Sequence, residues 1–158
     1  MDPIRKTLTI PLPPADAFHL FTHGIDTWWP KDSHSLSAND GDLPQKIDIE
    51  PKTGGKITET KPDGTKAPWG RVTRWDPARA FGMDWHVGRP ADQATQVLVV
   101  FSQVEAGTRI ELTHSGFENL TTNAIATHAG YQTGWDFVLG QCYLDRATSR
   151  PLLHNMIL

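Results

Sequence analysis

Several short segments of the chain alternate between apolar and polar residues, with the period of two that is typical of half-buried β-strands. The first such segment is residues 4–10, and prolines end it. Two short helices are predicted next, at residues 14–21 and 25–29, followed by a polar loop over residues 31–45. Six more strands are predicted, at residues 46–50, 56–61, 68–75, 80–87, 95–104 and 108–114. Turn residues separate these segments, which favours antiparallel hairpins.

Near the end of the chain the period changes to that of an α-helix. Residues 127–148 contain no proline, and their large apolar residues share one helical face: Tyr131, Trp135, Val138, Leu139 and Cys142. Such a helix is about 30 Å long, which is enough to cross a sheet. The order of elements therefore predicts an α+β fold, in which a long C-terminal helix packs across a curved antiparallel sheet of six or seven strands. A gap between helix and sheet leaves room for a ligand.

The length of 158 residues suits a single domain, with its core at residues 4–147 and a tail at residues 148–158. The net charge is −3 and no block of lysine and arginine occurs, which argues against a dedicated nucleic-acid binder. The chain has no apolar run long enough to span a membrane, and its first residues do not resemble a signal sequence. We therefore expect no membrane insertion and a cytoplasmic location. The single cysteine, Cys142, excludes an internal disulfide.

Strand parity indicates which side chains face the interior between sheet and helix. On residues 108–114 the inward set ends at His114. By the same rule the carboxylates that can be placed on strands, among them Asp84, point outward, as does His86. For residues 68–75 the inward face stays undecided, because large residues fall on both sides. A lone inward histidine cannot form a nucleophile–base pair, so we expect no catalytic residues.

Two further patterns have some features of cofactor sites. His19 and His23 lie four residues apart on a predicted helix, as metal ligands can, but no third ligand is evident nearby. The glycines at positions 54, 55 and 88 lack the spacing and the strand–helix context of a phosphate-binding loop. We therefore expect neither a metal nor a nucleotide cofactor.

Six tryptophans against two tyrosines are a heavy indole content for a chain of this size. An indole is bulky and carries an N–H group, so it suits the wall of a cavity as well as a core. Together with inward strand residues these rings predict a pocket lined by Trp29, Trp69, Met83, Trp85, Phe101, Leu112, His114, Tyr131 and Trp135. His114 is the expected polar contact. Such a pocket suits a small hydrophobic or aromatic molecule with one hydrogen-bonding group. Core packing is the alternative role of each tryptophan.

Short sequence blocks also follow one another in the order of a known family. They are residues 13–18, Trp28-Trp29-Pro30, residues 34–35, 54–57, 69–72, 75–77, 81–86, 107–114 and Gly134-Trp135. In these blocks, spread over residues 4–147, the chain resembles homologues of the activator of the heat-shock protein 90 ATPase, in the START-like (SRPBCC) superfamily. The resemblance implies the helix-grip fold and a protein that binds a small molecule, and the lack of an inward carboxylate leads us to expect that it is non-catalytic. A protein-interaction or co-chaperone-like module is an alternative, in which the apolar tail contacts a chaperone, another protein or a second copy as a homodimer. A superfamily hydrolase or cyclase is a further alternative.

Overall fold

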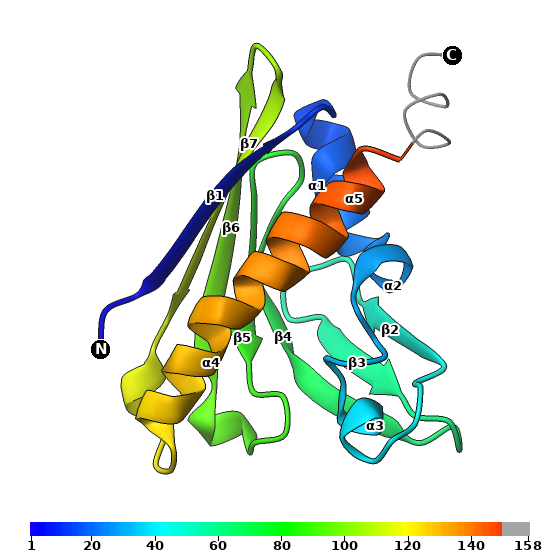
Figure 1. Cartoon of the computed structure of the whole chain (residues 1–158), viewed down its shortest axis with the longest axis vertical. Helices are drawn as coiled ribbons and strands as arrows, with labels where there is room; N and C mark the ends of the chain where they lie inside the picture. The colour runs from blue at the N-terminus through cyan, green and yellow to red at the C-terminus, as the bar shows by residue number, and fades with distance from the viewer. Residues whose placement is uncertain (150–158) are drawn as a thin grey trace.

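Seven antiparallel strands form one sheet that bends around the C-terminal helix in this computed structural model, which describes residues 1–149 (Figure 1). The strand order is β1-β7-β6-β5-β4-β3-β2. The strands are β1 (Ile4–Ile10), β2 (Lys46–Ile49), β3 (Lys56–Thr60), β4 (Lys66–Asp76), β5 (Ala80–Trp85), β6 (Thr95–Val104) and β7 (Gly107–Ser115). This arrangement confirms the predicted α+β helix-grip fold. From residue 150 onward the predicted tail lies outside the described residues.

Short helices follow β1, and a long helix ends the described chain. The helical elements are α1 (Pro14–Thr22), α2 (Ile25–Trp28), α3 (Leu36–Asn39), η1 (Ala91–Gln93), η2 (Phe117–Asn119), α4 (Ala124–Phe137), the π-helical segment η3 (Val138–Tyr143) and α5 (Leu144–Ala147). The last three follow one another without a break and cross the sheet as the predicted C-terminal helix (Figure 1). Among residues 1–149 no helix is both long enough and apolar enough to cross a membrane.

The predicted polar loop over residues 31–45 contains α3, which is a correction to the sequence reading. Ser35 caps this helix, because its hydroxyl oxygen accepts a hydrogen bond from Ala38 N–H at 3.0 Å. The same hydroxyl donates to the Lys31 carbonyl oxygen at 2.7 Å. A helix of four residues is too short to show a helical period, so hydrophobic periodicity in the sequence does not predict α3.

Two bulges in β4 explain why parity left the inward face of that strand undecided. The register with β3 shifts at Trp69, and the register with β5 shifts at Thr73. Each bulge adds one residue to β4 and turns the following side chains to the opposite face. Trp69 and Val72 are therefore both buried, although strict alternation would place them on opposite faces.

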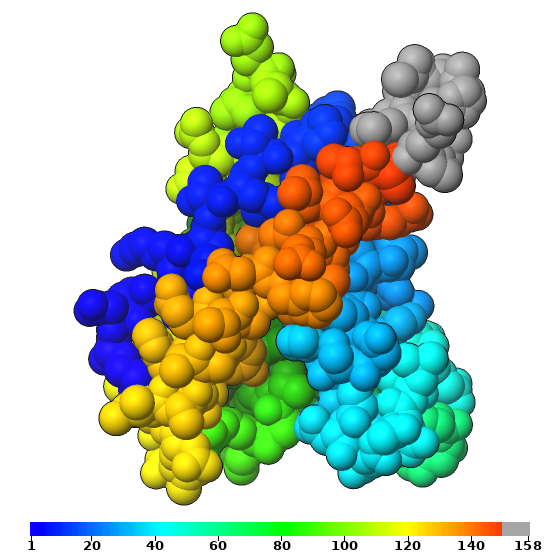
Figure 2. Space-filling model, viewed as in Figure 1, coloured from blue at the N-terminus to red at the C-terminus, as the bar shows by residue number. Residues whose placement is uncertain are grey.

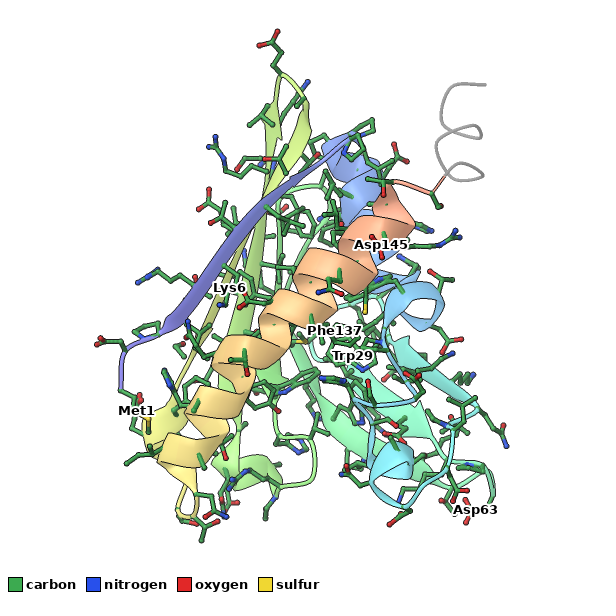
Figure 3. The ribbon with its side chains drawn as sticks, in the orientation of Figure 1. Met1, Lys6, Trp29, Asp63, Phe137 and Asp145 are labelled. Carbon is green, nitrogen blue, oxygen red and sulfur yellow. The ribbon has the colours of Figure 1, made fainter. Side chains whose placement is uncertain are left out.

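The core lies between the concave face of the sheet and the helices that cover it. The Tyr143 hydroxyl donates to the Ala17 carbonyl oxygen at 2.8 Å, which joins the C-terminal helix to α1. Trp29 lies beside the middle of the C-terminal helix, on the side of the sheet (Figure 3). The predicted inward face of β7 is confirmed, since Leu112 and His114 are 1% and 0% exposed.

Two side chains contradict the parity prediction. Glu59 on β3 is fully buried, although strand carboxylates were expected to point outward. It has the parity of the buried Ile57, and hydrogen-bond donors surround its carboxylate, as described below. His86 is also buried rather than outward, because β5 ends one residue before it and its ring turns back toward the following loop. There His86 Nδ1 donates to the Arg89 carbonyl oxygen at 3.0 Å.

Candidate ligand-binding site

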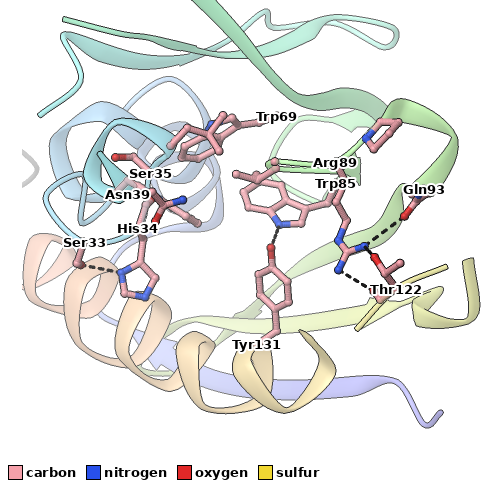
Figure 4. A pocket seen from close by; sticks show the side chains of 15 residues that line it. Ser33, His34, Ser35, Asn39, Trp69, Trp85, Arg89, Gln93, Thr122 and Tyr131 are labelled. Atoms are coloured by element: carbon pink, nitrogen blue, oxygen red, sulfur yellow. Dashed lines mark hydrogen bonds between the residues drawn. The ribbon is translucent and has the colours of Figure 1, made fainter. Parts of the chain in front are cut away.

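A pocket of about 610 Å³ opens between α3, the β5–β6 loop and the first half of α4 (Figure 4). In the space-filling view a hollow separates the cyan segment that holds α3 from the yellow start of α4 (Figure 2). Four aromatic residues line the pocket: Trp29, Trp69, Trp85 and Tyr131. The other lining residues are mostly polar: Ser33, His34, Ser35, Leu36, Asn39, Val87, Gly88, Arg89, Pro90, Gln93 and Thr122. We call this site the aromatic pocket.

Three indoles of the aromatic pocket pack against one another. The ring centroid of Trp29 lies 5.3 Å from that of Trp69 and 5.7 Å from that of Trp85, and the last two are 5.4 Å apart. Each indole N–H already has an acceptor. The N–H of Trp29 donates to the His34 carbonyl oxygen at 2.7 Å, and that of Trp69 donates to the Glu59 carboxylate at 3.0 Å. The N–H of Trp85 donates to Tyr131 Oη at 2.8 Å. Rings held in this way lose little freedom when a ligand binds, so the wall is preorganised.

The buried carboxylate of Glu59 holds two parts of the pocket wall, α3 and Trp69, in place. Its carboxylate accepts hydrogen bonds from the N–H groups of Leu36 and Ser37, both at 2.8 Å, from the Ser37 hydroxyl, and from Trp69 Nε1–H at 3.0 Å. Burial alone raises the pKa of a carboxyl group, but the hydrogen bonds from Ser37, Leu36 and Trp69 outweigh it and lower the pKa of Glu59. The ionised group therefore holds α3 and Trp69 together. The inward parity of Ile57, two residues earlier, is the sequence signal that could have identified it.

His114 does not line the aromatic pocket, which contradicts its predicted role as the polar contact. Trp135 Nε1–H donates to His114 Nδ1 at 3.0 Å, so the proton of the neutral ring is on Nε2. His114 Nε2 then donates to Thr95 Oγ1 at 2.7 Å, and Thr95 donates to the Trp85 carbonyl oxygen at 3.1 Å. Burial, with a smaller effect of His128, lowers the pKa of His114 to about 3. Both ring nitrogens are thus occupied within the core.

The structure brings together four of the nine predicted lining residues: Trp29, Trp69, Trp85 and Tyr131. Met83, Phe101 and Leu112 are buried in the core and do not line this pocket. Trp135 lines a neighbouring apolar cleft of about 280 Å³. This cleft shares three residues with the aromatic pocket: Trp29, His34 and Tyr131.

Loop residues at the rim supply polar groups that the sequence pattern did not single out. Arg89, on the β5–β6 loop, reaches across to Thr122 and Thr127. Burial lowers the pKa of His34, against a smaller raising effect of Asp32. Both rim residues lie outside regular strands, where no period indicates which way a side chain points. Within residues 1–149 no cluster of three histidine, cysteine or acidic residues could hold a metal ion.

Comparison with known proteins assigns the family. The family model described as "Activator of Hsp90 ATPase homolog 1-like protein" matches residues 11–141. The chain belongs to this family. No curated protein sequence matches the chain.

Solved structures of similar proteins agree with the fold. A Mesorhizobium loti protein has 17% identity and a TM-score of 0.66, with 94% of this chain and 99% of that chain covered. The dimeric Aha1 of Colwellia psychrerythraea has 20% identity and a TM-score of 0.62, with 94% and 100% covered. At 27% identity the chain is also similar to an anthrahydroquino-γ-pyrone synthase, Txn09, solved in complex with a compound designated SUM. That match has a TM-score of 0.57 and covers 84% of this chain and 88% of the synthase.

Proposed function

We propose that the protein binds a small, planar aromatic molecule in the aromatic pocket. The main support is the wall formed by the preorganised indoles of Trp29 and Trp85, backed by the buried Trp69, beside a volume of about 610 Å³. Pockets for small organic ligands typically have volumes of about 300–1,000 Å³. Flat rings pack well against indoles, and each such contact adds about 0.5–1.5 kcal/mol beyond the burial of area. A planar ligand therefore fits this wall better than a flexible alkyl chain.

The relative with the highest identity among the solved structures named above supports an aromatic ligand. The Txn09 synthase is named for an anthrahydroquinone-derived γ-pyrone, a fused ring system. A ligand of this shape has an apolar face and polar edges. In the aromatic pocket the face would meet the indoles, and the edges would meet the polar residues of the rim, among them His34 and Arg89.

Calorimetric titration of the intact chain with anthraquinone-2-carboxamide, combined with quenching of tryptophan fluorescence, tests this function. Asn39 is exposed at the rim, so Asn39→Phe narrows the pocket without removing a buried contact. We expect this variant to bind about tenfold more weakly, which corresponds to about 1.4 kcal/mol. Asp42→Phe adds the same ring to an exposed position outside the pocket and is the matched control. Its affinity should stay within about twofold of the wild type.

Decanamide serves as the non-aromatic ligand with the same neutral carboxamide group, and we expect it to bind at least about tenfold more weakly than the anthraquinone. If anthraquinone-2-carboxamide and the carboxylate and hydroxy analogues with the same ring system all fail to bind, the proposed function is wrong. If the anthraquinone binds equally well to Asn39→Phe and to the wild type, the aromatic pocket is not the binding site.

Ring closure on a bound aromatic ligand is a second candidate function, favoured by the similarity to the synthase. The lowered pKa of His34 keeps its imidazole neutral at pH 7, where it can accept a proton, and Tyr131 offers a hydroxyl group in the same pocket. Closure of an o-hydroxyaryl 1,3-diketone to a γ-pyrone releases one water and changes the ultraviolet spectrum. Faster closure with the protein than in buffer, reduced in His34→Gln, would support catalysis. An unchanged rate would leave binding as the function.

A further inference from the structure

Arg89 places a positive charge at the aromatic pocket among neutral partners. Its guanidinium donates to four acceptors: Gln93 Oε1 at 3.2 Å, Thr122 Oγ1 at 3.4 Å, the Thr122 carbonyl oxygen at 3.0 Å and Thr127 Oγ1 at 3.0 Å. The ion pairs within residues 1–149 join other charges: Lys6–Asp136, Lys31–Asp26 and Arg74–Asp76. The four neutral contacts hold the side chain of Arg89 in place, but they leave its charge uncompensated.

The surroundings of Arg89 strengthen this positive potential. Thr122 lies just before α4, and the amino end of a helix carries a partial positive charge. The first turn of α4 contains no acidic residue that could compensate it. Arg89 is itself half-buried, and a cation removed from water without a counter-ion is unfavourable. A bound anion would compensate both the partial charge at the start of α4 and the half-buried charge of Arg89.

Tyr131 adds an unused hydrogen-bond donor to the same pocket. Its Oη accepts from Trp85 Nε1–H at 2.8 Å, and among the described residues no acceptor receives its own hydroxyl hydrogen. Figure 4 shows Tyr131 and Arg89 beside Trp85 on one side of the pocket. The pKa of Tyr131 is raised, because the effect of burial exceeds the lowering effects of the hydrogen bond from Trp85 and of the charge of Arg89. The hydroxyl group thus stays protonated at neutral pH and lies within the field of the guanidinium.

We infer that the ligand of the aromatic pocket carries an anionic oxygen, and that Arg89 and the Tyr131 hydroxyl recognise it. This inference rests on the proposed function and names the class of aromatic molecule involved, namely a carboxylate or a phenolate. The guanidinium supplies the opposite charge, and the hydroxyl supplies a directional hydrogen bond. The threonine hydroxyls that accept from Arg89 have hydrogens of their own, which can turn toward the same anion.

Three probes with one ring system test the inference: anthraquinone-2-carboxylate, 2-hydroxyanthraquinone and anthraquinone-2-carboxamide. Calorimetry on the intact chain at pH 8.5 compares their affinities at low and high salt. We expect the carboxylate to bind at least about tenfold more tightly than the carboxamide, and added salt to reduce this preference. If the hydroxy probe shows the stronger preference, the anionic oxygen is that of a phenolate.

Variants assign the preference to named groups. Arg89→Gln removes the charge, so the ratio of carboxylate affinity to carboxamide affinity should fall to about twofold or less. Tyr131→Phe keeps the ring and removes the donor, and it should weaken carboxylate binding about three- to tenfold. Arg109→Gln removes an exposed arginine from the outer face of β7 and should leave the preference unchanged.

Equal affinity of the wild type for all three probes overturns the inference, as does a preference that survives in Arg89→Gln. In both cases binding of the neutral carboxamide would leave the proposed function intact. Failure of all three probes to bind would overturn the proposed function and the inference together. If Arg89→Gln does not fold, the comparison of wild type with Tyr131→Phe and the salt dependence decide the question.

Discussion

Glu59→Gln tests how the aromatic pocket is built. In the folded chain the carboxylate accepts from three N–H groups and one hydroxyl. Hydrogen bonds to a charged group contribute about 1.5–3 kcal/mol each, and a buried N–H without a partner costs about 1–3 kcal/mol. Glutamine keeps one accepting oxygen, but its NH₂ group faces at least one of these N–H donors. Relief of the burial penalty of the charge offsets part of the loss, so we expect the free energy of unfolding to fall by about 2–3 kcal/mol.

Urea denaturation at pH 7 measures this change. Glu50→Gln is the matched control, because the Glu50 carboxylate accepts one hydrogen bond, from Lys56 N–H at 2.7 Å, at the surface. The control should lose less than about 0.5 kcal/mol. Loss of the contact with Trp69 should also change the tryptophan fluorescence of the folded Glu59→Gln protein, but not that of the control.

The dependence on pH gives a second measurement of the same interaction. The pKa of Glu59 is lower in the folded chain than its ordinary value of 4.5. The stability contributed by the carboxylate is therefore complete well above pH 4.5, and it is lost as the pH falls through the folded pKa. The stability difference between wild type and Glu59→Gln should shrink in that acid range. A loss below about 0.5 kcal/mol at pH 7, or a difference that persists in acid, would refute the assigned role.

Two further predictions concern the core behind the pocket. Trp135→Ala removes a ring that is 2% exposed and should lower the free energy of unfolding by about 3–5 kcal/mol. A loss below about 1 kcal/mol in urea denaturation would show that this ring does not anchor the C-terminal helix. Because burial lowers the pKa of His114 to about 3, the unfolded chain takes up a proton first as the pH falls below about 6.5. As the pH falls from 7.5 to 5.5, protonation of His114 in the unfolded chain should lower the free energy of unfolding by about 1.4 kcal/mol. This loss should be absent in His114→Gln and should remain in His19→Gln, the control at an exposed histidine. Equal losses in the two variants would contradict the assignment.

Elements with clean alternation were predictable from the sequence. In β7 every second residue from Thr108 to His114 is buried, because this strand lies between two partners without a bulge. In β4 the bulges at Trp69 and Thr73 reverse the parity, and a pattern of period two cannot show where such a reversal occurs. The helix α3 was not predictable for a different reason, since the side-chain cap of Ser35 and the carboxylate of Glu59 stabilise it rather than an apolar face.

The pocket was predictable only in part. Trp29, Trp69 and Trp85 carry bulky rings that need space in the interior between sheet and helix. Their clustering could therefore be expected from the composition and the strand order. The polar rim did not follow, because the direction of Arg89 depends on contacts with Thr122 and Thr127, more than thirty positions away. The roles of His114 also depended on distant partners, which a strand pattern does not contain.

The indole N–H signals in a two-dimensional ¹H–¹⁵N spectrum test the binding site most directly. The chain has six tryptophans, and single Trp→Phe variants assign their signals. On addition of anthraquinone-2-carboxylate, the signals of Trp29, Trp69 and Trp85 should shift together, because these rings line the aromatic pocket. The signals of Trp28 and Trp75, which do not line it, should stay in place. A bound probe that shifts Trp75 and leaves the three pocket signals unchanged would contradict binding at this site.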